Sequence, residues 1–302
     1  MIHDLSMTAV VENTAGTSGV MGEWGFSLWI EADGHSILFD TGKGSALRHN
    51  AAALGIDLAT AQSLVISHGH YDHIGGVAEA AAAGFSGKIY VHPGALHAKY
   101  QRDQGAPPRQ IGSTAQSLAV LRARPDSLVL TSEPVQIVPG LLVTGTVPRQ
   151  DPHEDDPGPF YLNGDCTEPD RLLDDQAMLI ETPLGWILIT GCGHAGLINL
   201  LHHARKLTAG GRVFAVLGGF HLFEASGARL EATLACLRNF GVELIAPCHC
   251  TGFEAIAFFR KELGAAVRPF PAGMRLHVSA EGAKSSLLRV WDSATTQPVV
   301  SH

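Results

Sequence analysis

The chain has 302 residues, of which 45% are hydrophobic, and it carries a formal net charge of −8. This apolar content supports a core of good size, in one large α/β domain or two small ones. The acidic balance and the lack of a dense Lys/Arg cluster argue against a nucleic-acid partner held by phosphate contacts.

Three further features bear on location. No apolar run approaches the roughly 18 residues that a membrane span needs, so we expect no membrane partner. The N-terminus, Met1-Ile2-His3-Asp4, lacks a basic start followed by an apolar core, so we expect no signal peptide. The cysteines number five, which is odd, and three of them lie beside histidines or glycines. This usage is typical of reduced thiols, and we predict a cytoplasmic protein.

The first part of the chain alternates strand-like runs with turns. Strands are predicted at 9–11, 26–30, 36–40, 63–67 and 88–91, and helices at 45–54 and 76–83. The pair Asp33-Gly34 reads as a hairpin turn between the second and third of these strands. The later strands and the helix between them form a βαβ unit, in which ligands collect at the carboxyl end of the strand.

The segment 67–73, Ser-His-Gly-His-Tyr-Asp-His, directly follows the apolar run 64–66. It places three imidazoles and a carboxylate, His68, His70, Asp72 and His73, within six positions. Zinc and similar ions favour such ligands. A surface loop with solvated rings is the alternative, but the adjoining strand and Gly75-Gly76 constrain the loop tightly. We therefore predict a metal site here.

Two long stretches interrupt the regular pattern, at about 98–135 and 148–175. Loops of this length inside a compact domain are usually functional or disordered. We interpret both as insertions that cover the site. A solvent-exposed insertion without substrate contact is the alternative.

In the second part, three successive strands each end in a Gly/Cys/His cluster before a helix begins. The clusters contain Cys192 and His194, then His221, and then Cys248, His249 and Cys250. The strands are predicted at 186–190, 213–217 and 242–246, and the helices at 197–207, 228–240 and 253–263. Because ligand sites in α/β sheets gather at the carboxyl ends of strands, we expect these clusters to join the first motif.

Together these motifs resemble the metallo-β-lactamase superfamily, and within it the branch of dihydropterin–ribofuranosyl-aminobenzene phosphate synthase-like proteins. Besides 67–73, the resemblance rests on the segments 23–27, 37–42, 50–57, 190–196, 218–222 and 247–252, and it covers roughly residues 5–275. It implies an α/β fold of the αββα sandwich type, with two packed mixed sheets and outer helices. We expect a single domain over residues 1–302 with the two insertions.

The resemblance also implies a ligand set. His68 and His70 would bind a first metal with His194, and Asp72 and His73 would bind a second with His249. One or two zinc ions are expected, with iron or manganese left open. The alternatives are that His249 is a core histidine and that His194 lies at a helix start without metal contact.

Two departures from the superfamily pattern stand out. Cys192 occupies the position where most members have a bridging aspartate, and the usual third histidine is absent around residues 174–176. Cys192 is either a soft thiolate ligand, which would favour zinc, or a buried thiol without a metal. Cys248 and Cys250 flank His249 on opposite faces of an extended segment, which argues against all three binding one ion.

Four further roles follow. Asp72 is a candidate general base in a site with one metal, and His221 is a candidate proton carrier or substrate contact, with a structural histidine as its alternative. Asp40 resembles the carboxylate that orients the metal loop. Glu23 lies in a segment typical of the branch and is expected to reach the site.

The leading interpretation is a metal-dependent hydrolase that uses metal-activated water. Its substrate would be a small-molecule phosphodiester, ester, lactone or thioester. The branch that the chain resembles implies a substrate that carries a phosphate group. The alternatives are a metal-binding sensor or scaffold with little turnover and an iron-dependent redox enzyme. The sequence leaves a homo-oligomer open.

Overall fold

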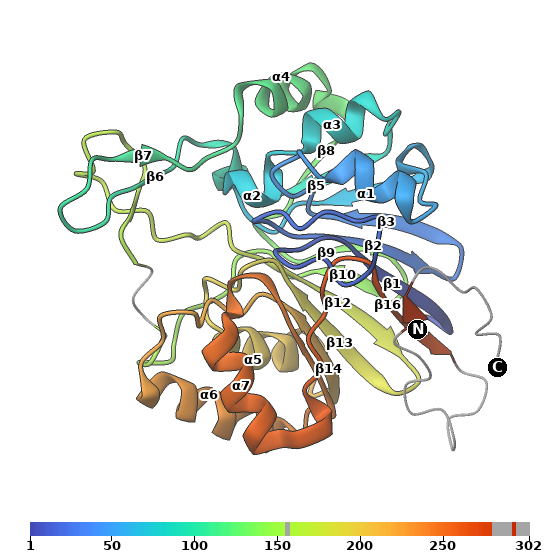
Figure 1. The fold of residues 1–302 in the computed structure, drawn as a ribbon, viewed down its shortest axis with the longest axis vertical. Coiled ribbons are helices and arrows are strands. Elements are labelled where there is room, and N and C mark those ends of the chain that lie inside the picture. Colours follow the sequence, from blue (N-terminus) through green and yellow to red (C-terminus); the bar gives the residue numbers. More distant parts are fainter. Residues whose placement is uncertain (155–157, 280–291, 294–302) are drawn as a thin grey trace.

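The computed structural model describes residues 1–154, 158–279 and 292–293. Two β-sheets pack face to face between two outer layers of helices (Figure 1). This arrangement confirms the predicted αββα sandwich. Within the described residues, no helix is long and apolar enough to cross a membrane.

The first sheet has the strand order β17-β16-β1-β2-β3-β4-β5-β8. Its strands are β1 Asp4–Val11, β2 Ser27–Ala32, β3 His35–Phe39, β4 Ser63–Val65, β5 Lys88–Val91, β8 Leu128–Leu130, β16 Met274–Ser279 and β17 Asp292–Ser293. Strands β3, β4, β5 and β8 run parallel, and the others pair antiparallel. The sheet is therefore mixed, and its parallel half leads into the histidine-rich loop.

The second sheet has the order β15-β14-β13-β12-β10-β9. Its strands are β9 Val135–Val138, β10 Leu141–Val143, β12 Ala177–Thr182, β13 Gly185–Thr190, β14 Val213–Gly218 and β15 Leu244–Pro247. Here β13, β14 and β15 are parallel, so their carboxyl ends share one edge. This edge carries all three clusters of the second half.

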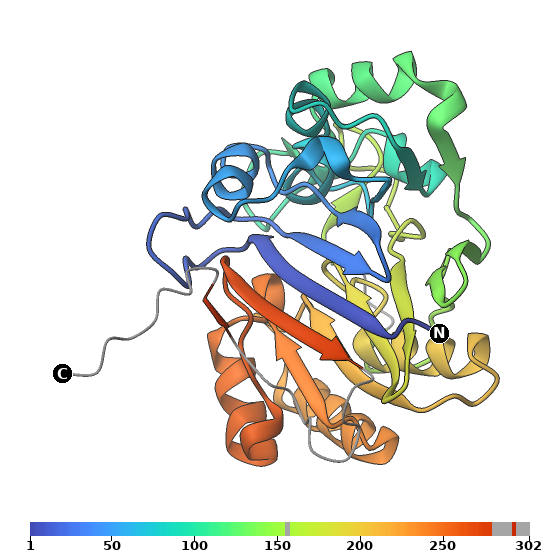
Figure 2. The ribbon, with the colours of Figure 1, turned by 90° about the vertical axis from the view of Figure 1, so that its right-hand side faces the viewer.

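Helices cover the outer face of each sheet, as Figures 1 and 2 show. The helices on the first sheet are α1 Leu47–Ala53, α2 Tyr71–Ile74, α3 Val77–Ala82 and α4 Ala115–Ala123. Those on the second are α5 Leu197–Leu207, α6 Gly227–Phe240 and α7 Phe253–Leu263. One-turn 3-10 helices occur at η1 Leu58–Thr60, η2 Pro93–Leu96, η3 Pro125–Ser127, η4 His249–Thr251 and η5 Gly264–Ala266.

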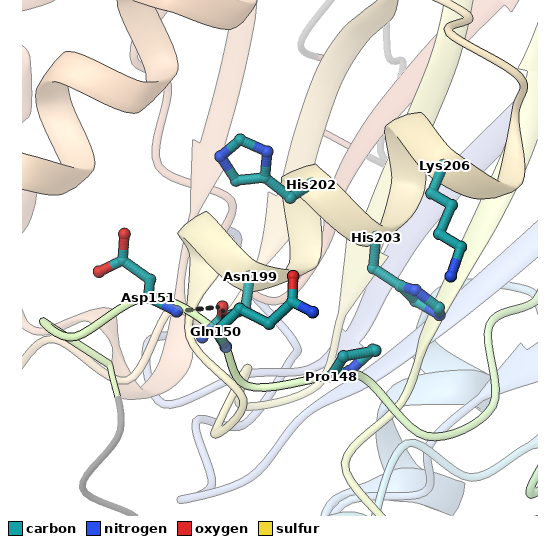
Figure 3. A pocket seen from close by; sticks show the side chains of 7 residues that line it. All are labelled: Pro148, Gln150, Asp151, Asn199, His202, His203 and Lys206. Carbon is teal, nitrogen blue, oxygen red and sulfur yellow. Dashed lines mark hydrogen bonds between the residues drawn. The ribbon is translucent and has the colours of Figure 1, made fainter.

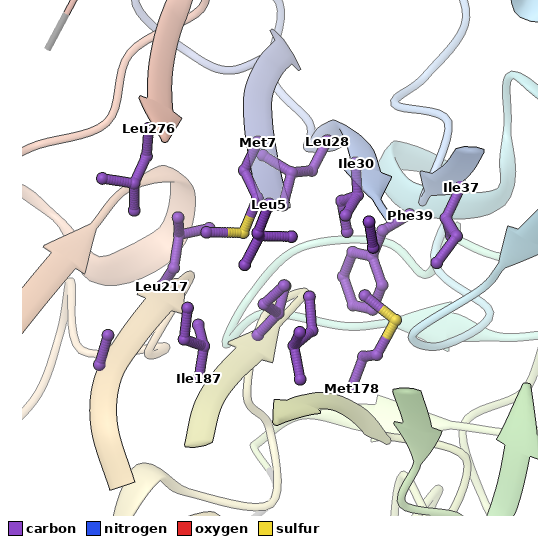
Figure 4. Packing of buried hydrophobic residues seen from close by; sticks show 14 of the residues in the cluster. Leu5, Met7, Leu28, Ile30, Ile37, Phe39, Met178, Ile187, Leu217 and Leu276 are labelled. Atoms are coloured by element: carbon purple, nitrogen blue, oxygen red, sulfur yellow. The ribbon is translucent and has the colours of Figure 1, made fainter. Parts of the chain in front are cut away.

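The core between the two sheets is wholly apolar in its centre (Figure 4). Leu5 and Phe39 point into it from the first sheet, and Met178, Ile187 and Leu217 from the second. All five are fully buried. Alternate residues of the strands face this core, as strand geometry requires. In the central strands, such as β4 and β14, the intervening residues pack under the outer helices. The sandwich thus fixes the relative position of the two ligand-bearing sheet edges.

The stretch predicted as an irregular insertion at 98–135 has more regular structure than expected. It contains α4 and ends in β8, which extends the first sheet. Its remaining part forms β6 Tyr100–Gln101 and β7 Arg109–Gln110, which join β11 Phe160–Tyr161 of the second insertion in a three-stranded sheet. Figure 1 shows the β6–β7 hairpin projecting to one side of the sandwich. Two-residue strands give too little periodicity to be read from a sequence.

Candidate metal centre

The first ligand group follows strand β4. The chain leaves the strand at Val65, and the helix α2 begins at Tyr71, so His68 and His70 lie in the loop between them while Asp72 and His73 lie in the first helical turn. All four side chains are buried, with His68 and His73 fully so. Burial of three histidines and a carboxylate in one loop is costly unless they find partners.

The second group comes from the edge of the other sheet. Cys192 and His194 follow β13, His221 follows β14, and His249 follows β15. The backbone of His221 and of His249 is left-handed, with φ of 48° and 51°. A non-glycine residue in this region is strained, and such strain persists only where the surrounding structure holds it.

The two groups meet in one cluster. Nε2 of His194 lies 3.2 Å from Nδ1 of His70. The ligand atoms of His68, Cys192 and His194 all lie within 4.8 Å of one another. Nε2 of His68 and of His70 are buried and have no hydrogen-bond partner among the described residues. Buried ring nitrogens without partners, beside a group of close ligand atoms, are what a metal site requires.

A second set lies beside the first. Nε2 of His73 lies 3.2 Å from Nε2 of His249 and 3.1 Å from Sγ of Cys192. Oδ2 of Asp72 lies 3.4 Å from Nε2 of His249 and 3.8 Å from Nε2 of His73. Cys192 belongs to both sets, since it also groups with His68 and His194. It therefore stands between the two candidate metal positions, where the superfamily pattern has its bridging aspartate.

The protonation states suit metal binding on the first set. Burial lowers the pKa of His68 and His194 well below the usual range, and it lowers that of His70 to about 3. Burial alone would raise the pKa of Asp72, but His73 and His249 outweigh it and hold the pKa below its usual range. The rings of the first set are thus neutral and Asp72 is ionised, which are the forms that bind a cation.

His73 is the exception. Burial would lower its pKa, but Asp40 and Asp72 raise the pKa to about 9. The ring therefore holds a proton on the nitrogen that faces His249 and Cys192, and a bound cation would take that proton's place. The donor set of imidazoles, a carboxylate and a thiol fits zinc or a similar borderline ion.

Asp40 has the contacts expected of the residue that orients the metal loop. It directly follows β3, and its Oδ2 accepts hydrogen bonds from Nδ1 of His73 at 2.7 Å and from Oγ of Ser67 at 2.6 Å. Its Oδ1 accepts from the backbone N–H of Ser67 at 2.7 Å. Gly191 packs closely against Ser67 and Asp40, since a Cβ atom at position 191 would lie 2.0 Å from Oγ of Ser67. Such carboxylate–histidine pairs fix the ring and raise its basicity.

Glu23 was expected to reach the site, and the structure gives it a different task. Its carboxylate accepts hydrogen bonds from the backbone N–H groups of Lys43, Gly44 and Ala46. It therefore holds the loop before α1. The physical reason is that the amide donors of this loop and of the N-cap residue Ala46 need an acceptor.

Two residues outside the predicted site hold His249 in place. Oε1 of Glu12 accepts from the backbone N–H of His249 at 2.7 Å, and Oδ1 of Asn13 lies 3.0 Å from its Nδ1. Both directly follow β1. A polar Glu-Asn pair at the end of an apolar strand is the signal that could have found them.

Cys250 lies nearer to the cluster than an extended segment would place it. An extended segment is predicted at 248–250, but η4 (His249–Thr251) coils the chain here. Cys248 enters the core between the sheets, whereas Sγ of Cys250 donates to the carbonyl of Cys192 at 3.3 Å. The ligand atoms of Cys192, His221 and Cys250 lie within 4.8 Å of one another. His221 thus reaches the cluster, as predicted from its strand-end position.

A pocket opens over the cluster. The pocket is lined by Trp24 and by residues of the metal loop, the second-sheet clusters and the two insertions. The lining residues are Trp24, His70, Tyr71, Asp72, Gln101, Arg109, Ile111, Phe160, Cys192, His194, His221, Phe223, His249 and Cys250. The ring of Phe160 lies 5.1 Å from that of His70 and 5.3 Å from that of His194. The three-stranded sheet of the insertions therefore lies over the histidines.

A second hollow marks where the insertion at 148–175 begins (Figure 3). Oδ1 of Asn199 on α5 accepts from the backbone N–H groups of Gln150 and Asp151, both at 2.9 Å. Glu154 then accepts from the N–H groups of Ile198 and Asn199 at the start of α5. These bonds hold the insertion on the helix that follows His194.

A family profile described as the metallo-beta-lactamase superfamily matches residues 25–198. The chain belongs to the metallo-β-lactamase superfamily. The matched range contains the whole metal loop, together with Cys192 and His194, so the resemblance in the sequence is confirmed.

Two curated relatives come from Methanocaldococcus jannaschii. One is named 7,8-dihydropterin-6-methyl-4-(beta-D-ribofuranosyl)-aminobenzene-5'-phosphate synthase and is 27% identical over 276 residues, covering 86% of this chain and 92% of the relative. The other is an uncharacterised protein, 32% identical over 248 residues, covering 82% of this chain and 91% of the relative.

Solved structures show the same fold. A crystal structure described as a metal-dependent hydrolase of the beta-lactamase superfamily has a TM-score of 0.77 and 29% identity, and the match covers 91% of this chain and 99% of that one. Zinc-bound PqqB from Methylobacterium extorquens has a TM-score of 0.54 at 15% identity, covering 90% of this chain and 99% of that one. The superfamily fold implies that this chain binds metal.

Proposed function

We propose that this superfamily member is a metal-dependent hydrolase that cleaves a small-molecule phosphodiester, ester, lactone or thioester. The observation that carries the proposal is the meeting of two ligand sets at the base of one pocket. His68, His70 and His194 would hold a first ion, and Asp72, His73 and His249 a second, with Cys192 between them. We propose zinc, in one or two copies.

A bound zinc ion in such a site supplies an acidified water at neutral pH and polarises the bond to be cleaved. The protein's own residues then have distinct tasks. In a site with one ion Asp72 is not a ligand; it is ionised and lines the pocket, so it could then accept a proton from water held at the cluster. His221 lies with its ring 4.2 Å from that of His194, at the pocket wall, and is placed to return a proton to the leaving group.

The relatives inform the substrate. The curated relative at 27% identity is named a synthase of a phosphorylated dihydropterin compound, so we propose that the present substrate is likewise a phosphorylated small molecule. The name of that relative describes bond formation, whereas the residues of this cluster support the activation of water. We further propose a cytoplasmic location, which the five free, buried cysteines support.

The test begins with the metal. Protein purified without added metal is analysed for its elements and is then assayed on bis(4-nitrophenyl) phosphate, a lactone panel and a thioester panel. We expect zinc and turnover of one substrate class. His70→Ala should lower kcat/KM at least about 100-fold. Removing a residue that only supports a ligand already lowers metal affinity or activity about 10–100-fold, and His70 is itself a proposed ligand.

His49→Ala is the matched control. His49 is exposed and its ring bonds to the carbonyl of Gly19, away from the cluster. It should keep wild-type activity. Wild-type activity in His70→Ala contradicts the hydrolase proposal. If the protein retains zinc but turns over none of the substrates, a metal-binding sensor is favoured. The feature that supports this alternative is Cys192, at the position of the usual bridging aspartate. Two irons with visible absorption would favour a redox enzyme.

A further inference from the structure

Arg109 is a cationic side chain in the wall of the metal pocket. It lies in β7 and is exposed. Its guanidinium donates a hydrogen bond to Oε1 of Gln101, and Tyr71 lines the same pocket. The ion pairs of Lys and Arg side chains in the described part of the chain involve other residues, namely Arg48, Lys99, Arg212 and Arg238. Among the described residues Arg109 itself forms no ion pair, so its charge is available to a ligand in the pocket.

The other walls of the pocket are aromatic. Trp24 is 50% exposed and its ring lies 5.4 Å from that of His249, and Phe223 is 46% exposed with its ring 5.6 Å from that of His221. Phe160 closes a third side over His70. Large apolar rings that stay exposed around a concave site are typical of surfaces that bind a ligand ring.

The hairpin that carries Arg109 is fixed to the metal loop. The backbone N–H of Tyr71 donates to the carbonyl of Ile111 at 2.8 Å, and the N–H of Ile111 donates to the carbonyl of Lys99 at 2.9 Å. Tyr71 directly precedes the candidate ligand Asp72. The guanidinium is thus held beside the metal cluster, but on a different element from any of the ligands.

We propose that Arg109 binds an oxyanionic group of the substrate that is separate from the bond cleaved at the metal centre. The substrate class that fits is an aromatic or heteroaromatic ring bearing a carboxylate or phosphate, with the ring between Trp24, Phe160 and Phe223. Planar guanidinium groups bind such oxyanions through paired, charge-assisted hydrogen bonds. This inference rests on the proposed metal-dependent activity, because it places the second recognition point relative to the metals.

The test uses zinc-loaded protein and two ligands that differ by one anion. Phenylphosphonate has a single oxyanion, and 4-phosphonobenzoate has two at opposite ends of one ring. Isothermal titration should show that 4-phosphonobenzoate binds the wild type about tenfold more tightly, as expected for one charge-assisted contact. In Arg109→Gln this ratio should fall to about one, while the affinity for phenylphosphonate stays within about twofold of the wild type. Arg109→Lys should keep part of the ratio.

Arg102→Gln is the matched control. Arg102 belongs to the same hairpin, but its guanidinium lies 5.5 Å from the ring of Tyr161 and donates to the carbonyl of Asp165. It should keep the tenfold ratio. Equal affinities of the two ligands for the wild type, or an unchanged ratio in Arg109→Gln, overturn the assignment of Arg109 alone. An equal loss in Arg102→Gln also overturns it, because the effect would then be one of net charge. If phenylphosphonate binds neither the wild type nor any of the variants, the metal-centre proposal is overturned as well.

Discussion

At the residue scale, the centre depends on side chains that orient the ligands. Asp40 accepts three hydrogen bonds from Ser67 and His73 and has a left-handed backbone, with φ of 55°. Asparagine tolerates that backbone, so Asp40→Asn changes the charge and leaves the chain path intact. We expect zinc affinity to fall about 10–100-fold, because the ring of His73 loses its carboxylate.

Competition with a chromogenic chelator measures this effect. Asp33→Asn is a suitable control, because Asp33 also has a left-handed backbone, with φ of 47°, and also accepts from backbone amides, those of His3 and Asp4. It lies at the exposed turn between β2 and β3, far along the strands from the loop that follows β3. Unchanged zinc affinity in Asp40→Asn would refute the orienting role.

At the element scale, a buried ion triad joins both insertions to the metal loop. Nζ of Lys99 is 2.6 Å from Oδ2 of Asp170 and 2.9 Å from Oδ1 of Asp174. The other oxygen of Asp174 accepts from the backbone N–H of Gly69, between two histidines, at 2.8 Å. The Lys99 side chain is only 1% exposed. One cation therefore holds the first insertion, the second insertion and the metal loop together.

Lys99→Met should lower the free energy of unfolding by about 3–5 kcal/mol, because it leaves two buried carboxylates without a counter-charge. Urea unfolding at pH 7 measures the change. The control is Arg212→Met, which breaks the half-exposed pair with Glu243 and should cost less than about 1 kcal/mol. A Lys99→Met cost as small as that of the control would show that the triad does not stabilise the fold.

The same triad predicts a pH dependence. Burial opposes both charges, but Asp174 and Asp170 raise the pKa of Lys99, and Lys99 lowers that of Asp174. The aspartate's contribution is complete above its unfolded pKa of about 3.9 and is lost as the pH falls through the lower folded value. The lysine's contribution is complete below about 10.4 and is lost as the pH rises through the higher folded value.

In Lys99→Met the buried carboxylates lose the charge that lowers their pKa, so they take up protons at a higher pH than in the wild type. The stability difference between wild type and Lys99→Met should therefore be largest between about pH 7 and 9 and shrink steadily as the pH falls toward about 4. Unfolding curves at a series of pH values test this. A difference that is largest at pH 3 would contradict the ion-triad account.

At the scale of the whole molecule, the sequence allowed the architecture and most candidate ligands to be predicted, because each signal is local. A strand followed within a few residues by His68 or His194 can be predicted from one short segment of sequence. Contacts between segments that are distant in the sequence could not be predicted. Glu12 and His249 meet because the two sheets pack face to face, and Cys250 turns toward Cys192 because of one 3-10 turn. Neither sheet packing nor a three-residue turn leaves a periodic pattern.

A metal at this centre would link the two halves of the sandwich, since His68, His70, Asp72 and His73 follow the first sheet and His194 and His249 follow the second. An ion that binds only the folded chain stabilises it by about 2.7 kcal/mol when its free concentration is about 100 times Kd. Removing zinc with EDTA should therefore lower Tm by about 5 °C or more for a chain of this size. Calorimetry with and without EDTA measures the shift.

Leu217→Ala separates this linkage from ordinary packing. The Leu217 side chain is fully buried in the apolar core between the sheets, and its truncation should cost about 2–5 kcal/mol. Because the cavity and the metal act at different places, the EDTA shift should be the same in this variant as in the wild type. Leu130→Ala, at a side chain that is 56% exposed, should change neither value. If EDTA strips the zinc without moving Tm, the ion does not bridge the two halves, and the ligands of the second sheet must be reassigned.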